Sequence, residues 1–174
     1  NEEKIQLAMI SDLVEKFPKK EKIDPLDSTW AITKSNLQAG TPFSRWNKAD
    51  NSVQQWQWEL TSLAIEAGNR EPVDADVRKM LDEALHSDQY WWASARPWWS
   101  LEMIERGAHE LKTLILKSPT AKTSEKKKAE KLYQQIIYTA LDWQRSGLVD
   151  EISRREDEEI RERLEEKEKL FISR

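Results

Sequence analysis

The feature that most constrains the fold is a row of apolar residues spaced three or four apart, which recurs along the chain. Rows of this kind run through residues 50–67, 101–117 and 124–146. The spacing places each row on one face of an α-helix, whereas a half-buried strand would need every second residue to be apolar. Only four glycines and six prolines interrupt the 174 residues, fewer than a turn-rich β fold would need. The sequence therefore predicts an all-α protein, a bundle of about five to six helices.

The N-terminal part is predicted to combine one helix with a long loop. Helix-spaced apolar residues run through residues 2–16 up to Phe17, and the residue before a proline avoids the helical region. Residues 18–49 show no helical period, yet a flexible linker would be poor in aromatic residues. We expect this irregular segment to be ordered and packed, because it contains the aromatic residues Trp30, Phe43 and Trp46.

A helix with one acidic member in its apolar row is predicted after Pro72. It begins near Asp74 or Asp76, and its row consists of Val77, Leu81, Ala84, Asp88 and Trp91. An unpaired buried carboxylate is costly, so Asp88 should be hydrogen-bonded, cap a helix or lie at a cleft. Pro97 fits the first turn of the next helix, where its missing N–H costs little.

The C-terminal segment differs from the rest because charged residues dominate it. We expect residues 1–149 to form the bundle domain and residues 150–174 to form a charged helical arm. Acidic residues precede basic ones by four positions, a spacing that stabilises a helix, in the pairs Asp157–Arg161, Glu159–Arg163 and Glu165–Lys169. A thin apolar row favours a solvated helix docked by one edge, or a protruding arm, over a coiled-coil partner helix.

Composition argues against several classes of function. The net charge is −4, whereas a nucleic-acid-binding domain usually has a basic excess, so no nucleic-acid partner is expected. No apolar run reaches the length of about 18 residues that marks a membrane helix, and no signal peptide is visible, so we expect a cytoplasmic protein without a membrane partner. Without cysteine, and with only Glu105 and His109 at ligand spacing, no metal or other cofactor is predicted. No nucleophile motif marks a catalytic residue.

Residues 86–99 contain most of the unusual chemistry, including two Trp-Trp pairs. Neighbouring side chains on a helix diverge by about 100°, so these rings cannot all face one core. Aromatic rows are more often core than site, but some of these rings should face a second surface. Ring faces stack on the C–H faces of sugars, and nearby polar side chains can bond the hydroxyls. The candidate substrate-binding residues are Asp88, Gln89, Trp91, Trp92 and Arg96.

Two sets of motifs carry a family resemblance. The first contains Ser28-Thr29-Trp30, Pro42-Phe43-Ser44-Arg45-Trp46, Asp50-Asn51, Trp58-Glu59-Leu60-Thr61 and Leu63-Ala64; the second is Ser87-Asp88-Gln89-Tyr90-Trp91-Trp92. Together they resemble the helical region that follows the catalytic barrel in glycoside hydrolase family 57 and its relatives. The resemblance covers residues 20–115, and nothing beyond Lys117 adds to it.

The resemblance implies a β/α barrel followed by a helical bundle, and hydrolysis or transfer of α-glucosidic bonds with retention. In that family the catalytic Glu and Asp belong to the barrel, for which this chain has no room, so no catalytic residue carries over. Asp88 matches a position that lines the substrate cleft, and Trp91 and Trp92 match more loosely. We therefore expect the helical domain of a longer carbohydrate-active protein, which forms one wall of an α-glucan cleft and is not catalytic alone.

Two alternatives remain open at the level of the sequence. The chain could be a stand-alone interaction module whose exposed tryptophans contact a protein partner, since tryptophan is enriched at such interfaces. It could instead be a small carbohydrate-binding module without catalysis. If the chain is instead the helical domain of a longer carbohydrate-active protein, we expect a catalytic barrel domain to pack on the tryptophan-rich face. The expected ligand is then an α-glucan oligosaccharide.

Overall fold

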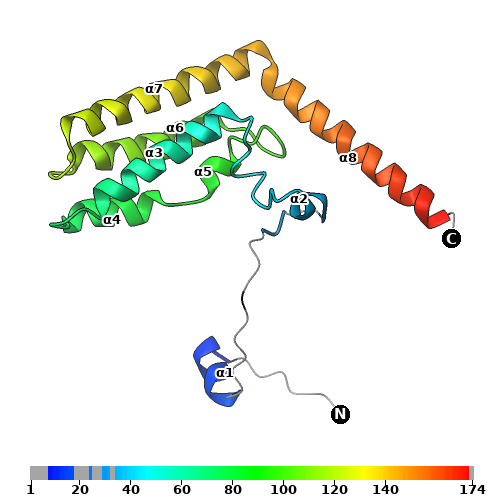
Figure 1. Ribbon diagram of the computed structural model, residues 1–174, viewed down its shortest axis with the longest axis horizontal. Helices are drawn as coiled ribbons and strands as arrows, with labels where there is room; N and C mark the ends of the chain where they lie inside the picture. Colours follow the sequence, from blue (N-terminus) through cyan, green and yellow to red (C-terminus); the bar gives the residue numbers. More distant parts are fainter. Residues whose placement is uncertain (1–7, 18–23, 25–28, 32–33, 173–174) are drawn as a thin grey trace.

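Eight helices and no strand make up the part of the chain that the computed structural model describes, residues 8–17, 24, 29–31 and 34–172. The predicted all-α class is confirmed, and two short helices raise the count above five to six. Figure 1 shows that four helices form the bundle: α3 (Ser52–Gly68), α4 (Ala75–Ala84), α6 (Leu101–Lys117) and α7 (Thr123–Ser146). None of the described helices combines the length and the apolar character needed to span a membrane.

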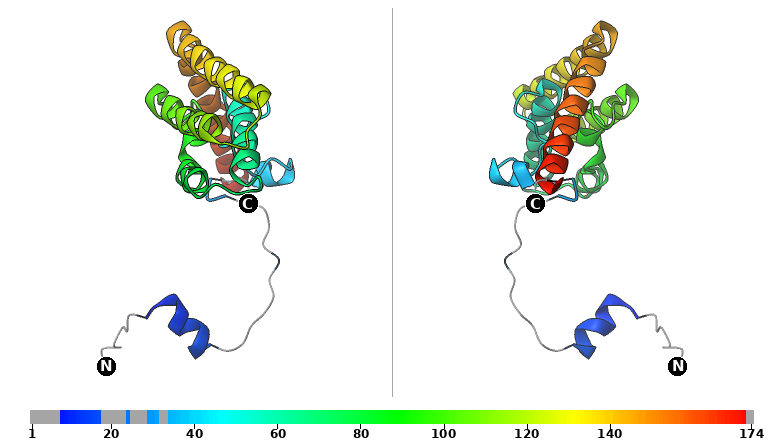
Figure 2. Two further views of the ribbon diagram at one scale, coloured as in Figure 1. Left: turned by 90° about the vertical axis from the view of Figure 1, so that its left-hand side faces the viewer. Right: turned by 90° about the vertical axis from the view of Figure 1, so that its right-hand side faces the viewer.

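The core lies where α3, α6 and α7 meet, with α4 packed against α6; Figure 2 shows this bundle nearly end-on. The predicted apolar rows supply many of the fully buried side chains, among them Val53, Leu60, Ile104, Leu111, Ile115 and Ile136. Outside its apolar row, α3 exposes Ile65 but buries a second side. The second side of α3 consists of polar residues, which position the site described below.

Local hydrogen bonds explain where the helices begin and end. The Asp74 side chain accepts from the first N–H groups of α4, and α6 begins at Leu101 because Ser100 accepts from the N–H of Met103. Pro97 therefore lies in a bend before α6 and not in its first turn. The predicted helix near 74–91 is two helices, because α4 ends at Ala84 and the short α5 (Asp88–Trp91) packs on α6.

The charged arm is one long helix, α8 (Leu148–Ile172), which leaves the bundle at an angle (Figure 1). It follows directly on Gly147, which ends α7 with a φ of 79° in the left-handed region. Asp157 forms an ion pair with Arg96, which lies between α5 and α6. It does not pair with Arg161, the partner that the sequence predicted within α8. The other two predicted pairs, Glu159–Arg163 and Glu165–Lys169, belong to the part of α8 whose side chains the structure does not describe.

Before the bundle, the structure contains two short helices. α1 (Ile10–Lys16) ends before Phe17 as predicted and has no buried residue, while residues 1–7 of the predicted helix 2–16 lie outside the described residues. Of the predicted loop 18–49, residues 18–23, 25–28 and 32–33 lie outside them as well. The remainder contains α2 (Lys34–Gln38) and a series of turns that reach the start of α3.

Candidate functional site

A hollow lined by aromatic rings opens between the turns before α3, the α3 helix itself and the start of α5. Its volume is about 650 Å³, within the range of small-molecule sites. The eight residues that line it, which define the aromatic hollow, are Thr29, Trp30, Phe43, Trp46, Asn47, Trp58, Ser87 and Tyr90. None of these eight side chains is charged. The hollow therefore offers ring faces with a few neutral polar groups at its edge.

The rings of the hollow form a packed wall and an open wall. Trp58 and Tyr90 stack with centroids 4.2 Å apart and planes 4° from parallel. In the open wall, the ring centroid of Trp46 lies 6.0 Å from that of Trp30, and both centroids lie 5.0 Å from that of Trp91. Trp30 is nevertheless 81 % exposed, so these contacts cover only a small part of it. A ligand could therefore reach the ring faces from the Trp30 side.

The polar ends of the two stacked rings are already bonded within the protein. The indole N–H of Trp58 donates to the carbonyl of Trp46 at 2.8 Å. The hydroxyl of Tyr90 lies 2.5 Å from the Thr61 hydroxyl, and burial raises the pKa of Tyr90. Only 4 % of Tyr90 is exposed. What this wall presents to the hollow is therefore ring surface and not hydrogen-bonding groups.

One fully buried amide side chain, that of Gln54, joins the loop 41–50 to α5. Its Nε2 donates to the carbonyls of Arg45 (2.8 Å) and Tyr90 (2.9 Å). Its Oε1 accepts from the backbone N–H of Lys48 at 2.9 Å. Because buried polar groups are costly unless bonded, this arrangement specifies where both segments lie against α3.

Two more amides of the same helix region hold the segment around α5. Asn51, which caps α3, donates from Nδ2 to the carbonyl of Ala93 at 2.7 Å. Gln57 donates from Nε2 to the carbonyl of Gln89 at 3.0 Å. Sequence reasoning missed these positioning residues, although a signal exists: Asn51, Gln54, Gln57 and Thr61 form a polar row at helical spacing.

Two of the five predicted site residues lie beside the hollow. Asp88 is exposed in the first turn of α5, next to Ser87 in the lining. Its carboxylate forms no hydrogen bond or ion pair with any side chain that the structure describes. The break after α4 removes Asp88 from the apolar row, so it is not the buried carboxylate that the row suggested. Trp91 contacts two lining rings, those of Trp30 and Trp46.

Gln89 and Trp92 face away from the hollow, toward α6 and the core. Gln89 is fully buried, and its Nε2 donates to the carbonyl of Ala84 at 3.2 Å. Trp92 packs against the core and meets Trp98 edge-on at 5.6 Å, with its indole N–H buried and unpaired. The expected divergence of neighbouring tryptophans is therefore confirmed by Trp91 and Trp92.

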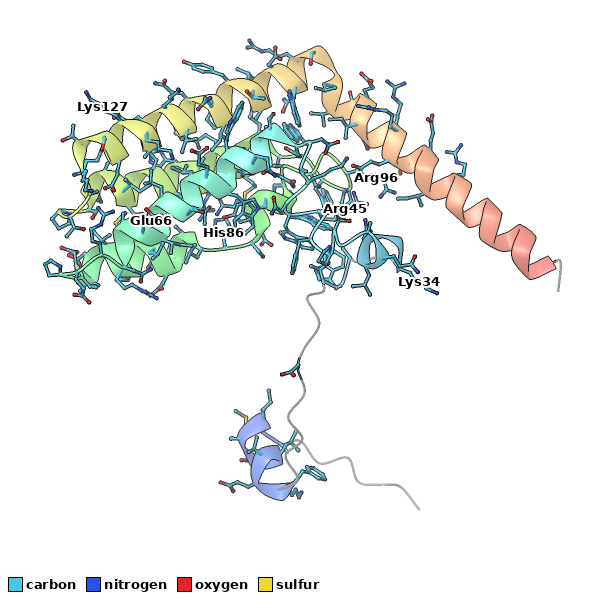
Figure 3. All side chains as sticks on the ribbon, in the orientation of Figure 1. Lys34, Arg45, Glu66, His86, Arg96 and Lys127 are labelled. Carbon is cyan, nitrogen blue, oxygen red and sulfur yellow. The ribbon has the colours of Figure 1, made fainter. Side chains whose placement is uncertain are left out.

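Arg96, the fifth predicted site residue, forms an ion pair with the charged arm, α8. Its Nε donates to Asp157 of α8, and its carbonyl accepts from Arg45 at 2.7 Å. Figure 3 shows Arg45 and Arg96 on the side of the molecule next to α8. Arg96 therefore connects two parts of the protein and does not line the hollow.

A smaller hollow of about 410 Å³ on α4 and α6 has His86, His109 and Glu110 in its lining. His86 Nε2 lies 3.5 Å from Glu110 Oε2, and His109 lies 4.0 Å from Glu105. Glu105 also accepts from the Tyr133 hydroxyl at 2.5 Å; burial, reinforced by this bond, raises the pKa of Tyr133 to about 12. Among the described residues, no three His, Asp or Glu side chains are placed to hold a metal ion.

No protein-family model matches the chain, and no curated protein and no solved structure is detectably similar to it. The resemblance to glycoside hydrolase family 57 is therefore carried only by the motifs in the sequence. The function is inferred below from those motifs together with the geometry of the aromatic hollow.

Proposed function

We propose that this chain is the helical domain of a cytoplasmic, carbohydrate-active protein similar to glycoside hydrolase family 57. In this proposal it forms one wall of an α-glucan cleft and is not catalytic alone. The observation that carries the proposal is the aromatic hollow, an uncharged recess walled by ring faces. It lies among the residues of the sequence motifs, since Trp30, Trp46, Trp58 and Ser87 belong both to its lining and to those motifs.

An uncharged oligosaccharide suits this lining better than a charged ligand does. The C–H faces of a sugar ring stack on indole planes, as other apolar surfaces do. Hydroxyls need polar partners near the edge. Asn47, Ser87 and the carboxylate of Asp88, which has no side-chain partner among the described residues, supply them. A nucleic acid would need cations along its path, and none of the eight lining residues is basic.

The proposal is tested by titrating the chain with maltoheptaose, a linear α-1,4-glucan, while tryptophan emission is followed. We expect a saturable change in emission for the wild type. Trp30→Ala should weaken binding about three- to tenfold, the loss that corresponds to one aromatic contact. Asp88→Asn should weaken it as well, because the neutral amide is a poorer acceptor for a hydroxyl.

Trp98→Ala is the matched control, because Trp98 is also exposed, at 54 %, and does not line the hollow. It should leave the affinity for maltoheptaose unchanged. Unchanged wild-type emission at millimolar maltoheptaose would contradict the proposal. An equal loss of affinity in the Trp98 and Trp30 variants would contradict the assignment of the hollow as the site.

A second candidate, a helical module for protein contacts, is favoured by the exposure of Trp98, of Ile10 in α1 and of Phe17 just after α1. Exposed large aromatic residues are typical of protein interfaces. The same titration separates the two candidates, because a protein-contact module should not respond to maltoheptaose. In that case deletion of the arm 150–174 should abolish association with the protein partner, as measured by analytical ultracentrifugation.

A further inference from the structure

A part-buried carboxylate on α8 bonds two side chains of the loop that lines the aromatic hollow. Glu156 accepts from Arg45 at 2.5 Å and from Lys48 at 3.1 Å. Only 14 % of its side chain is exposed, so the carboxylate is largely removed from water while it faces two cations. Charge-assisted bonds of this kind are stronger than neutral ones, and partial burial protects them from screening by salt. We call Glu156, Arg45 and Lys48 the Glu156 clamp.

Both cations of the clamp belong to the loop that supplies one wall of the hollow. Phe43, Trp46 and Asn47 line the hollow, whereas Arg45 and Lys48, which alternate with them, bond to α8. The loop is a tight turn at this point, because the N–H groups of Trp46 and Asn47 both donate to the carbonyl of Phe43 at 2.8 Å. A displacement of the two cations would therefore displace the two rings.

The loop is held on two sides, by α3 and by α8, and on the α3 side Gln55 bonds the Asn47 side chain at 2.9 Å. On the α3 side, Gln54 bonds only to its backbone, at Arg45 and Lys48. On the α8 side, Glu156 bonds only to its side chains. The backbone bonds set where the loop lies, and the clamp restrains how the turn is oriented.

We infer that Glu156 is a positioning residue, through which α8 fixes the Phe43 and Trp46 wall of the aromatic hollow without touching a ligand. The arm is then part of the binding site and not only an appendage to the bundle. The identity of the ligand rests on the proposed function, whereas the ordering of the loop by Glu156 does not depend on it.

The first readout is hydrogen exchange of the full chain, followed by mass spectrometry of the peptide that covers residues 41–50. Glu156→Gln removes the charge and keeps the shape, so the amides of Trp46 and Asn47 should exchange faster, by about tenfold, which corresponds to the loss of one charge-assisted bond. Glu156→Asp keeps the charge and should restore part of the protection. Unchanged exchange in Glu156→Gln overturns the inference.

The matched control is Glu151→Gln on the same helix. Glu151 lies 3.8 Å from Arg155, is more than half exposed and contacts neither the loop nor the hollow. Its variant should leave exchange over residues 41–50 unchanged. Faster exchange in both variants would show a general loosening of α8 and would overturn the specific role of Glu156.

The second readout is the affinity for maltoheptaose. Glu156→Gln should weaken binding several-fold, and the temperature of unfolding should stay close to that of Glu151→Gln. Lys48→Met removes the bond between Lys48 and Glu156 and should also weaken the binding of maltoheptaose. If exchange quickens but the affinity is unchanged in both variants, the positioning role is overturned. If the wild type does not bind maltoheptaose, the proposed function fails, and the exchange measurement still decides the inference.

Discussion

Buried amides are the residues that sequence reasoning located least well. Gln54, Gln57 and Gln89 are fully buried, although glutamine on a helix usually marks the solvated face. Gln54 and Gln57 are buried because carbonyl groups from a distant segment reach them in the folded chain. Gln89 instead donates to the carbonyls of Ala84 and His86, just before it in the sequence. Asp88 illustrates the converse error, since its place in an apparent apolar row depended on a helix that ends at Ala84.

Gly107 gives a prediction at this scale, because it allows α5 to approach α6. A Cβ added at this position would lie 2.5 Å from Gln89 Oε1 and 2.6 Å from Gln89 Cβ. At an exposed helical site, Gly→Ala stabilises by about 1 kcal/mol. Gly107→Ala should instead destabilise the protein by about 1–3 kcal/mol through overpacking, as measured by urea unfolding.

Lys127→Ala provides the reference for this measurement, because Lys127 is exposed on α7. It should change the free energy of unfolding by less than about 0.5 kcal/mol. An unchanged or increased stability of Gly107→Ala would show that the contact between Gln89 and Gly107 is looser than described.

Among the secondary-structure elements, the long helices were predictable and the short ones were not. The apolar rows located α3, α6 and α7 closely, because these helices bury the same face along their whole length. The division between α4 and α5 left no equivalent signal, since the apolar spacing continues across it. The prediction that Pro97 lies in the first turn of α6 was also wrong, because the cap at Ser100 decides where α6 begins.

The connection between the end of α3 and the start of α7 leads to a prediction on pH. Glu125 receives two bonds of 2.8 Å from Arg70 and one of 2.7 Å from the N–H of Lys122. The Arg70 bonds, followed by the Lys122 bond, lower the pKa of Glu125 to about 2. A carboxyl with a lowered pKa stabilises the folded state above its ordinary pKa of 4.5, and this contribution is lost as pH falls toward 2.

Glu125→Gln should therefore lower the temperature of unfolding at pH 7 by about 2–4 °C. The difference in the temperature of unfolding between Glu125→Gln and the wild type should become smaller as pH falls from 4.5 toward 2. Circular dichroism melts across this range measure both effects, and Glu130→Gln, an exposed change on the same helix, is the comparison. A gap that stays constant with pH would contradict the role of the Glu125 charge.

On the scale of the whole molecule, the aromatic hollow is a product of tertiary structure. Its lining comes from residues 29–47, from α3 and from the start of α5, which are distant in sequence. The tryptophan-rich segment pointed to the region, but Phe43, Trp46 and Trp58 could be assigned to the same hollow only from the structure. Sequence patterns record which residues avoid water and not which distant segments meet.

The N-terminal helix supplies the prediction for the whole molecule. α1 has no buried residue, and Figure 1 shows it apart from the bundle. A chain without residues 1–17 should therefore unfold within about 2 °C of the full chain, because the α1 helix that it loses contributes no buried residue. A much larger decrease, measured by circular dichroism, would show that α1 docks on the bundle in solution.

Gly147 makes the arm a mechanical lever. With a rise of about 1.5 Å per residue, α8 extends about 37 Å from this pivot, and Glu156 lies about 12 Å along it. A rotation of about 10° at Gly147 would move the far end by about 6 Å but Glu156 by only about 2 Å. A force applied at the tip would act on the Glu156 clamp with roughly threefold mechanical advantage, so a weak contact made far from the bundle could shift the rings of the hollow.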